Sequence, residues 1–143
     1  MQMSAFDELA SRFLDTRRSL PYVRFDKEIT KKIKNEICIL SYLKSHNGIA
    51  HPKDLSEEFL VSSARMAVIL NQLESKEYIS RTADQNDSRQ TLVKILPKGN
   101  LFFEEENEKM VKFISGFFKE IGEKDANDFV RLYVKLMKFV AKK

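Results

Sequence analysis

Hydrophobic positions in the middle of the chain follow the spacing of an α-helix. Between residues 62 and 76 they stand three or four apart, which gives a helix one apolar face of Met66, Ile69, Leu70 and Leu73. Ser62 precedes this run and can accept a hydrogen bond from the first free N–H groups, so we expect it to cap the helix. The other face carries mostly small or hydrogen-bonding side chains, which suits a helix that enters a groove: Ser63, Ala64, Arg65, Val68, Asn71, Gln72 and Ser75.

A β-hairpin is predicted to follow this helix. Residues 78–82 and 91–96 are short, β-prone and partly alternating. The intervening residues 83–90, which we call the wing, are polar and rich in turn residues, so they can project as an exposed tip. Helix, strand, polar tip and strand in this order predict a winged helix-turn-helix, a mainly α fold with a small β-hairpin.

Three helices are predicted before the Ser62 helix. An apolar stripe over residues 4–19 indicates the first, which Pro21 should end. The second ends near Gly48, and it begins either at Asn35 or as far back as Asp26, because its stripe can be extended in that direction. A short third helix has Pro52 in its first turn.

Two further helices are predicted after the hairpin. The first spans residues 100–121 and is ended by Gly122, and Asp125 can cap the second. Seven of the eleven phenylalanines lie after residue 98, which is more apolar surface than two isolated helices can bury on themselves. We therefore expect a homodimer, with dimerisation or connector helices in 1–34, the winged module in 35–97 and dimerisation helices in 98–143.

An ordered series of residues resembles the MarR family of bacterial transcription regulators. The series is Gln72-Leu73-Glu74-Ser75-Lys76-Glu77-Tyr78-Ile79-Ser80-Arg81, then Asn86-Asp87-Ser88-Arg89, then Leu96-Pro97-Lys98-Gly99. The family ends its recognition helix in Leu-Glu, places an arginine on the next strand and Asp-x-Arg in the wing, and has a glycine after the second strand. This chain departs from the pattern at Val68, where a basic or polar residue is common, and at Glu77, where glycine is usual.

The resemblance implies a regulator, most simply a repressor, that binds a pseudo-palindromic duplex as a homodimer. The helix over 62–76 then enters the major groove, and Arg89 in the wing enters the minor groove. It further implies that Asp87 orients the Arg89 guanidinium and that Arg81 supports the same carboxylate. A cleft for a small apolar or phenolic ligand between the dimer helices and the winged module is also implied, on no particular residues.

Side-chain chemistry suggests how the helix reads DNA. Arg65 is the only cation on its outward face and can bond a guanine edge, whereas Asn71 or Gln72 can serve adenine. Phosphate contacts, which set the register without reading sequence, are expected from a second group: Ser62, Ser63 and Lys53.

Charge supports DNA binding only weakly. The isoelectric point is about 9.1, but residues 44–97 carry seven basic and seven acidic side chains. A winged module used for protein–protein contact is therefore an alternative. No apolar run approaches the length of a membrane span and no secretory signal begins the chain, so we expect a cytoplasmic protein. No phosphate loop, nucleophile elbow or dinucleotide fingerprint is present, which predicts neither an enzyme nor a cofactor.

Cys38 is the only cysteine and opens a second alternative, a redox-sensing regulator. It stands among apolar residues with no neighbouring cation in sequence to lower the pKa of its thiol, which favours a buried, unreactive side chain. His46 and His51 flank a turn between helices, and two histidines alone lack the ligands of a metal site.

Overall fold

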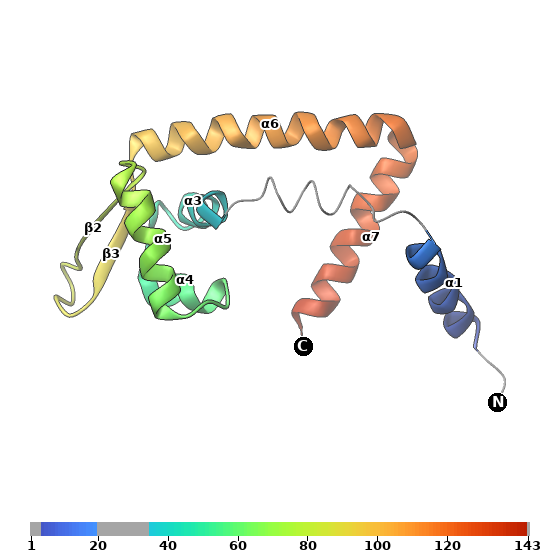
Figure 1. Cartoon of the computed structure of the whole chain (residues 1–143), viewed down its shortest axis with the longest axis horizontal. Coiled ribbons are helices and arrows are strands. Elements are labelled where there is room, and N and C mark those ends of the chain that lie inside the picture. The colour runs from blue at the N-terminus through green and yellow to red at the C-terminus, as the bar shows by residue number, and fades with distance from the viewer. Residues whose placement is uncertain (1–3, 20–34, 143) are drawn as a thin grey trace. The chain divides into compact units, whose positions relative to one another are not determined.

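The structure is a computed structural model that describes residues 4–19 and 35–142 (Figure 1). The chain divides into two units, residues 1–34 and 35–143. Whether Pro21 ends the first helix, and whether the second begins near Asp26, are questions that fall outside the described residues.

The described part of the first unit is one helix, α1 (Ala5–Ser19), as predicted. It begins with a reciprocal cap, in which the Ser4 hydroxyl accepts a hydrogen bond from the Asp7 N–H and the Asp7 carboxylate accepts one from the Ser4 N–H. The hydrogen bond from the Ser4 side chain is the main cause that lowers the pKa of Asp7. None of the residues of α1 is buried, so its apolar stripe is exposed.

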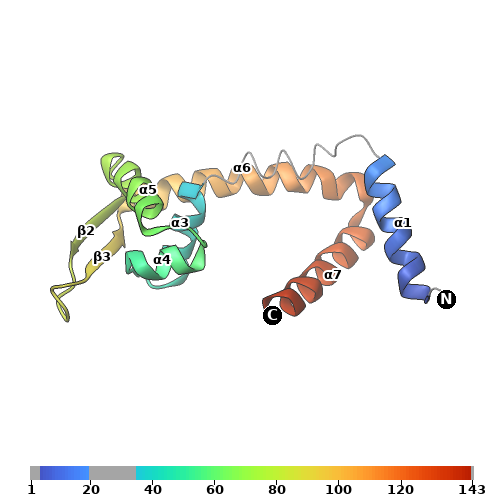
Figure 2. The same cartoon turned by 60° about the horizontal axis from the view of Figure 1, so that its bottom comes forward.

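The described residues of the second unit form five helices and a three-stranded antiparallel sheet with the strand order β1-β3-β2. The winged module consists of α3 (Asn35–Ser45), β1 (Ile49–Ala50), α4 (Pro52–Glu58), α5 (Ser63–Ser75), β2 (Ile79–Ala83) and β3 (Thr91–Ile95). Two longer helices follow it, α6 (Pro97–Ile121) and α7 (Glu123–Ala141). Figure 2 shows the loop between β2 and β3 projecting beyond the module's helices.

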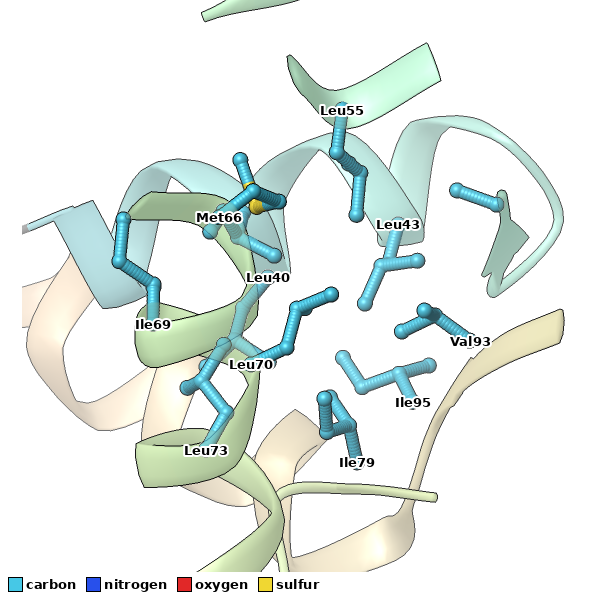
Figure 3. Packing of buried hydrophobic residues seen from close by; sticks show 12 residues of the cluster. Leu40, Leu43, Leu55, Met66, Ile69, Leu70, Leu73, Ile79, Val93 and Ile95 are labelled. Carbon is cyan, nitrogen blue, oxygen red and sulfur yellow. The ribbon is translucent and has the colours of Figure 1, made fainter. Parts of the chain in front are cut away.

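One apolar core joins the elements of the winged module (Figure 3). The predicted face of α5 is turned into it, and Met66, Leu70 and Leu73 are each at most 1% exposed. They meet side chains from α3, α4 and both strands of the hairpin: Ile39, Leu40, Leu43, Leu55, Ile79 and Val93. The helical periodicity of the sequence therefore identified the buried face of α5 correctly.

The sheet has one strand more than predicted. Ile49 and Ala50 form β1, which pairs with Lys94 and Val93 on the free edge of β3. Two residues are too few for apolar and polar positions to alternate visibly, so the sequence pattern could not indicate this strand. It ties the start of α4 to the sheet on which the wing is built.

Two predicted boundaries after the hairpin are wrong. The helix expected to begin at residue 100 begins at Pro97, directly after Leu96 at the N-cap, because proline suits a first helical turn. Asp125 does not cap α7, because Gly122 with its positive φ both ends α6 and occupies the N-cap position. Asp125 instead lies inside the first turn, where a carboxylate is stabilised by the helix dipole.

All three helices of the winged module are followed by a non-glycine residue with left-handed backbone. These residues are Asn47, Leu60 and Glu77, with φ values of 59°, 52° and 62°. In each case the next N–H bonds back to a carbonyl in the last turn, which satisfies an acceptor that the helix would otherwise leave free. Glu77 thus has, at the entry to β2, the left-handed backbone that glycine adopts most readily.

Gly99 permits the close approach of α6 to the hairpin. A Cβ atom built at this position would lie 2.2 Å from the backbone oxygen of Tyr78, too close for any side chain. That same oxygen accepts a hydrogen bond from the N–H of Leu96 at 2.9 Å, so it cannot move aside freely. The glycine of the family's junction is therefore required by packing.

We expect Gly99→Ala to lower the free energy of unfolding by about 1–3 kcal/mol, the usual cost of overpacking a filled site. Gly116→Ala is the matched control on the same helix, because a Cβ there meets nothing within 4 Å. That variant should be neutral or stabilised by roughly 0.5–1 kcal/mol, since alanine favours a helix interior. Urea unfolding of both variants measures the difference, and equal stabilities would contradict the packing role of Gly99.

Candidate nucleic-acid interface

The outward face of α5 is exposed as predicted. Ser62 caps the helix, and its hydroxyl oxygen accepts a hydrogen bond from the N–H of Arg65 at 3.1 Å. The side chains that the sequence assigned to this face all lie on the surface of the module: Ser63, Ala64, Arg65, Val68, Asn71 and Gln72. Lys53 is exposed in the first turn of α4, one helix earlier. The predicted reading face and one predicted phosphate contact are thus available to a partner.

Arg81 does not support Asp87, which corrects one sequence-based expectation. Its guanidinium instead reaches across to α5, where it bonds both carboxylate oxygens of Glu74 at 3.1 and 3.2 Å and the Asn71 side-chain oxygen at 2.6 Å. This contact is the main cause that lowers the pKa of Glu74. Arg81 therefore ties the first strand of the hairpin to the recognition helix.

Asp87 and Arg89 are in contact, but not in the way that was predicted. The Asp87 carboxylate accepts a hydrogen bond from the backbone N–H of Arg89 at 3.0 Å, and the Asp87 carbonyl accepts one from the N–H of Gln90 at 3.0 Å. Asp87 therefore shapes the turn of the wing and does not orient the guanidinium. The Arg89 side chain is exposed at the tip.

His51 and Asp84 join the base of the wing to the start of α4, a contact that the sequence analysis missed. Nε2 of His51 lies 2.7 Å from an Asp84 carboxylate oxygen, while Nδ1 lies 3.4 Å from a carboxylate oxygen of Asp54. The Asp84 N–H also donates to the carbonyl of Gln90 at 2.9 Å, which closes the loop across its base. These two side chains are 33 residues apart in the chain, so no local pattern could have paired them.

The same contact shifts both pKa values. The hydrogen bond to Asp84 is the largest cause that raises the pKa of His51, and the hydrogen bond to His51 is the largest that lowers the pKa of Asp84. A raised histidine pKa gives stability that is complete below its ordinary value and is lost as pH rises through the folded-state value. The lowered pKa of Asp84 gives stability that is lost as pH falls through its folded-state value. The pair therefore contributes most to stability at pH values between the folded-state pKa of Asp84 and that of His51.

Apart from Lys94, which is exposed on β3, the remaining cations of the module fall into two groups. Lys76 is paired with Glu36 on α3 at 2.8 Å, and Lys44 with Glu104 on α6 at 2.7 Å. Across residues 4–19 and 35–142, by contrast, no ion pair involves the three cations on the reading side: Lys53, Arg65 and Arg89. The zero net formal charge of residues 44–97 therefore includes three cations, unpaired among the described residues, beside the outward face of α5 and at the wing.

Cys38 has the environment of an unreactive thiol. It lies half-buried on α3, and this burial raises the pKa of its thiol, which reduces the nucleophilic thiolate. His46 stacks on Tyr42 with ring centroids 3.8 Å apart, which is a packing contact between two rings. In the described stretches no group of three His, Cys, Asp or Glu side chains could hold a metal, and no helix there is long and apolar enough to span a membrane.

We expect the His51 imidazole to titrate above about 6.5, the value of an unperturbed histidine. In Asp84→Asn the pKa of His51 should fall toward that value, because the partner carboxylate is lost. Proton NMR of the ring resonances measures both, and His46, the other histidine of the chain, serves as the internal control. Identical His51 titration in the two proteins would show that Asp84 does not hold the ring in solution.

Comparisons with known proteins agree with this geometry. A family model described as the winged helix DNA-binding domain matches residues 35–114. The uncharacterized HTH-type transcriptional regulator YwhA of Bacillus subtilis strain 168 is 21% identical over 136 residues, which are 95% of each chain. A MarR family protein from Bacillus stearothermophilus has a TM-score of 0.69 at 18% identity, over 98% of this chain and 99% of that one.

The transcriptional regulator BldR from Sulfolobus solfataricus has a TM-score of 0.66 at 20% identity, over 99% of this chain and all of its own. The fold predicted from the sequence and its resemblance to the MarR family are both confirmed. The chain belongs to the family of winged helix DNA-binding domains and has the fold of the MarR regulators.

Proposed function

We propose that the chain is a transcription regulator, most simply a repressor in the cytoplasm, that binds pseudo-palindromic duplex DNA as a homodimer. The observation that carries this proposal is the capped α5, whose apolar face is buried while its small and polar face is exposed. A helix of this kind fits the major groove of B-DNA, where base edges are distinguishable. The family to which the winged module belongs is one of DNA-binding proteins.

Three cations suit a duplex that lies along this face. Arg65 in the first turn of α5 is placed for a guanine edge or a phosphate, and Lys53 in the first turn of α4 for a phosphate. Arg89 at the tip of the wing is placed for the minor groove, whose negative potential attracts an exposed guanidinium. Ser62 and Ser63 add hydroxyl groups at the N-terminus of α5, where a phosphate is favoured.

Exposed apolar side chains outside the module support the homodimer. On α7 large hydrophobic residues are between 39% and 59% exposed, and on α1 Phe6 and Phe13 are 81% and 65% exposed. Isolated apolar residues are ordinary on a surface, but a helix that exposes them over its whole length marks an interface. A two-fold axis would cover these faces and hold two copies of α5 about 34 Å apart, one turn of DNA.

The proposal includes a small apolar or phenolic ligand that lowers the affinity for DNA. Only the resemblance to the MarR family supports this ligand. Such a ligand would act by binding more tightly to a dimer whose reading helices are wrongly spaced. Redox control through Cys38 is disfavoured by the raised pKa of its thiol.

Arg89→Ala should weaken binding to a selected duplex about tenfold or more, since a well-placed arginine contact is worth about 1–3 kcal/mol and a dimer carries two. Gel shifts across a salt series, on duplexes first selected from random sequence, measure this. The affinity of the normal chain should itself fall steeply with salt.

Lys112→Ala is the matched control, because it removes one exposed positive charge from α6. Its affinity should stay within about twofold of the unchanged protein, as is usual for a surface change away from the contacts. Normal affinity in Arg89→Ala would remove the wing from the interface. A chain that binds no selected duplex would favour the alternative, a winged module for protein–protein contact.

Leu136→Glu should convert the dimer to monomers, because Leu136 is 56% exposed on the apolar surface of α7 and a carboxylate cannot be buried there unpaired. Lys138→Gln changes the net charge by the same amount at a polar position of the same helix, and it should stay dimeric. Light scattering at micromolar concentration gives the mass of each. If the unchanged chain is a monomer under these conditions, the proposed assembly is wrong.

A further inference from the structure

The side chain of Asn71, which is exposed on the reading face of α5, is held from one side by Arg81. The two bonds between Arg81 and Glu74 fix the plane of the guanidinium, because they use Nε and Nη2 together. Nη2 also donates to the Asn71 oxygen at 2.6 Å. The three residues form a clamp between β2 and α5, with the Arg81 side chain 26% exposed and that of Glu74 41% exposed.

Chemistry decides which end of the Asn71 amide meets Arg81. A guanidinium carries five N–H donors and no acceptor, so it can bond the amide oxygen and would repel the amide NH2. The orientation of an asparagine side chain is set by its hydrogen-bond partners, and here the partner allows one choice. Oδ1 of Asn71 therefore points toward β2, which leaves Nδ2 with its two N–H donors available to a ligand on the reading face.

We propose that Arg81 is a positioning residue for base recognition and that it makes Asn71 a hydrogen-bond donor in the major groove, directed at guanine. The inference rests on the proposed function, in which α5 lies in that groove. Guanine presents two neighbouring acceptors there, O6 and N7. Cytosine presents the N4 donor, and adenine places its N6 donor beside N7, so each faces the Nδ2 donors with a donor of its own. Thymine presents the single acceptor O4 beside its methyl group, so guanine alone offers two acceptors to the two N–H groups.

This assignment replaces the adenine contact that asparagine makes in the groove when its amide is unrestrained. That bidentate contact needs Oδ1 to accept a bond from adenine N6 while Nδ2 donates to N7. In this chain the oxygen accepts a short, charge-assisted bond from Arg81, which holds Oδ1 toward β2. Its second lone pair would have to reach adenine N6 from that position, whereas Nδ2 is directed at the groove. An exposed neighbour, Gln72, has no such partner in the described part of the chain and remains suited to adenine.

The test is a selection of bound duplexes from random DNA with the full chain and three variants. Asn71→Ala identifies the position in each half-site that this side chain reads, because preference should be lost there and kept elsewhere. At that position the unchanged chain should prefer guanine over adenine about tenfold or more. Arg81→Met keeps the aliphatic stem and removes the donors, so the guanine-to-adenine ratio should fall at least severalfold at the same position only.

Asn71→Asp covers the case in which Arg81→Met fails to fold. It keeps the contact with Arg81, and stability with it, but offers no N–H, so the guanine preference should vanish. Lys53→Ala is the control for affinity, because loss of a phosphate contact weakens all sequences alike and leaves the base preferences unchanged.

Several results would overturn the inference while leaving the proposed function intact. They are an adenine preference at the position read by Asn71, no position that depends on Asn71, or an unchanged ratio in a folded Arg81→Met. If no duplex is selected at all, the proposed function fails and this inference fails with it. A merely structural Arg81 would alter affinity or melting temperature without changing the preference at one base pair.

Discussion

The burial of one face of α5 is the constraint on which the rest of the winged module depends. Met66, Leu70 and Leu73 are almost completely withdrawn from water, and burial of each such side chain contributes roughly 1.5–3 kcal/mol. A helix with this face fixed against α3 and the hairpin has no freedom to rotate about its axis. Its opposite face, including Arg65 and Asn71, must then point outward, so the core positions the reading side chains more firmly than their own contacts do.

Two polar contacts connect the β2 side of the wing to the helices that the core holds in place. Arg81 joins β2 to α5, and Asp84 at the end of β2 joins the wing to His51 at the start of α4. A hairpin whose first strand is held by contacts with two different helices cannot swing freely about them, so the exposed tip is carried at a defined place beside the reading face. The Arg81–Glu74 pair uses two hydrogen bonds from one guanidinium, which adds geometric specificity to the contact.

Local patterns in the sequence predicted much of this arrangement, and non-local contacts account for what they missed. The periodicity from Ser62 onward located α5 to within one residue at each end, because helix caps and apolar spacing are encoded in neighbouring positions. The partner of Arg81 was predicted wrongly. Arg81 lies opposite Val93 in the middle of the sheet, whereas Asp87 lies beyond the end of β2. Because an extended strand covers about 3.3 Å per residue, the two side chains are too far apart to meet. The side chains that Arg81 actually contacts are on α5, and Asp84 likewise lies on a different element from its partner His51.

In the proposed homodimer, the scarcity of unpaired cations gives the apolar helices a role in DNA binding. Each module offers Lys53, Arg65 and Arg89 on its reading side, while Lys44, Lys76 and Arg81 are paired with carboxylates within the chain. Affinity for DNA rests largely on phosphates neutralised, so one module alone binds weakly. When two modules are linked, the second binds its half-site as an intramolecular event, and the combined affinity can exceed either alone by a factor of roughly 10²–10⁴. In the proposed homodimer, a chain with so few unpaired cations in its winged module therefore depends on the apolar surfaces of α1 and α7 for its hold on an operator.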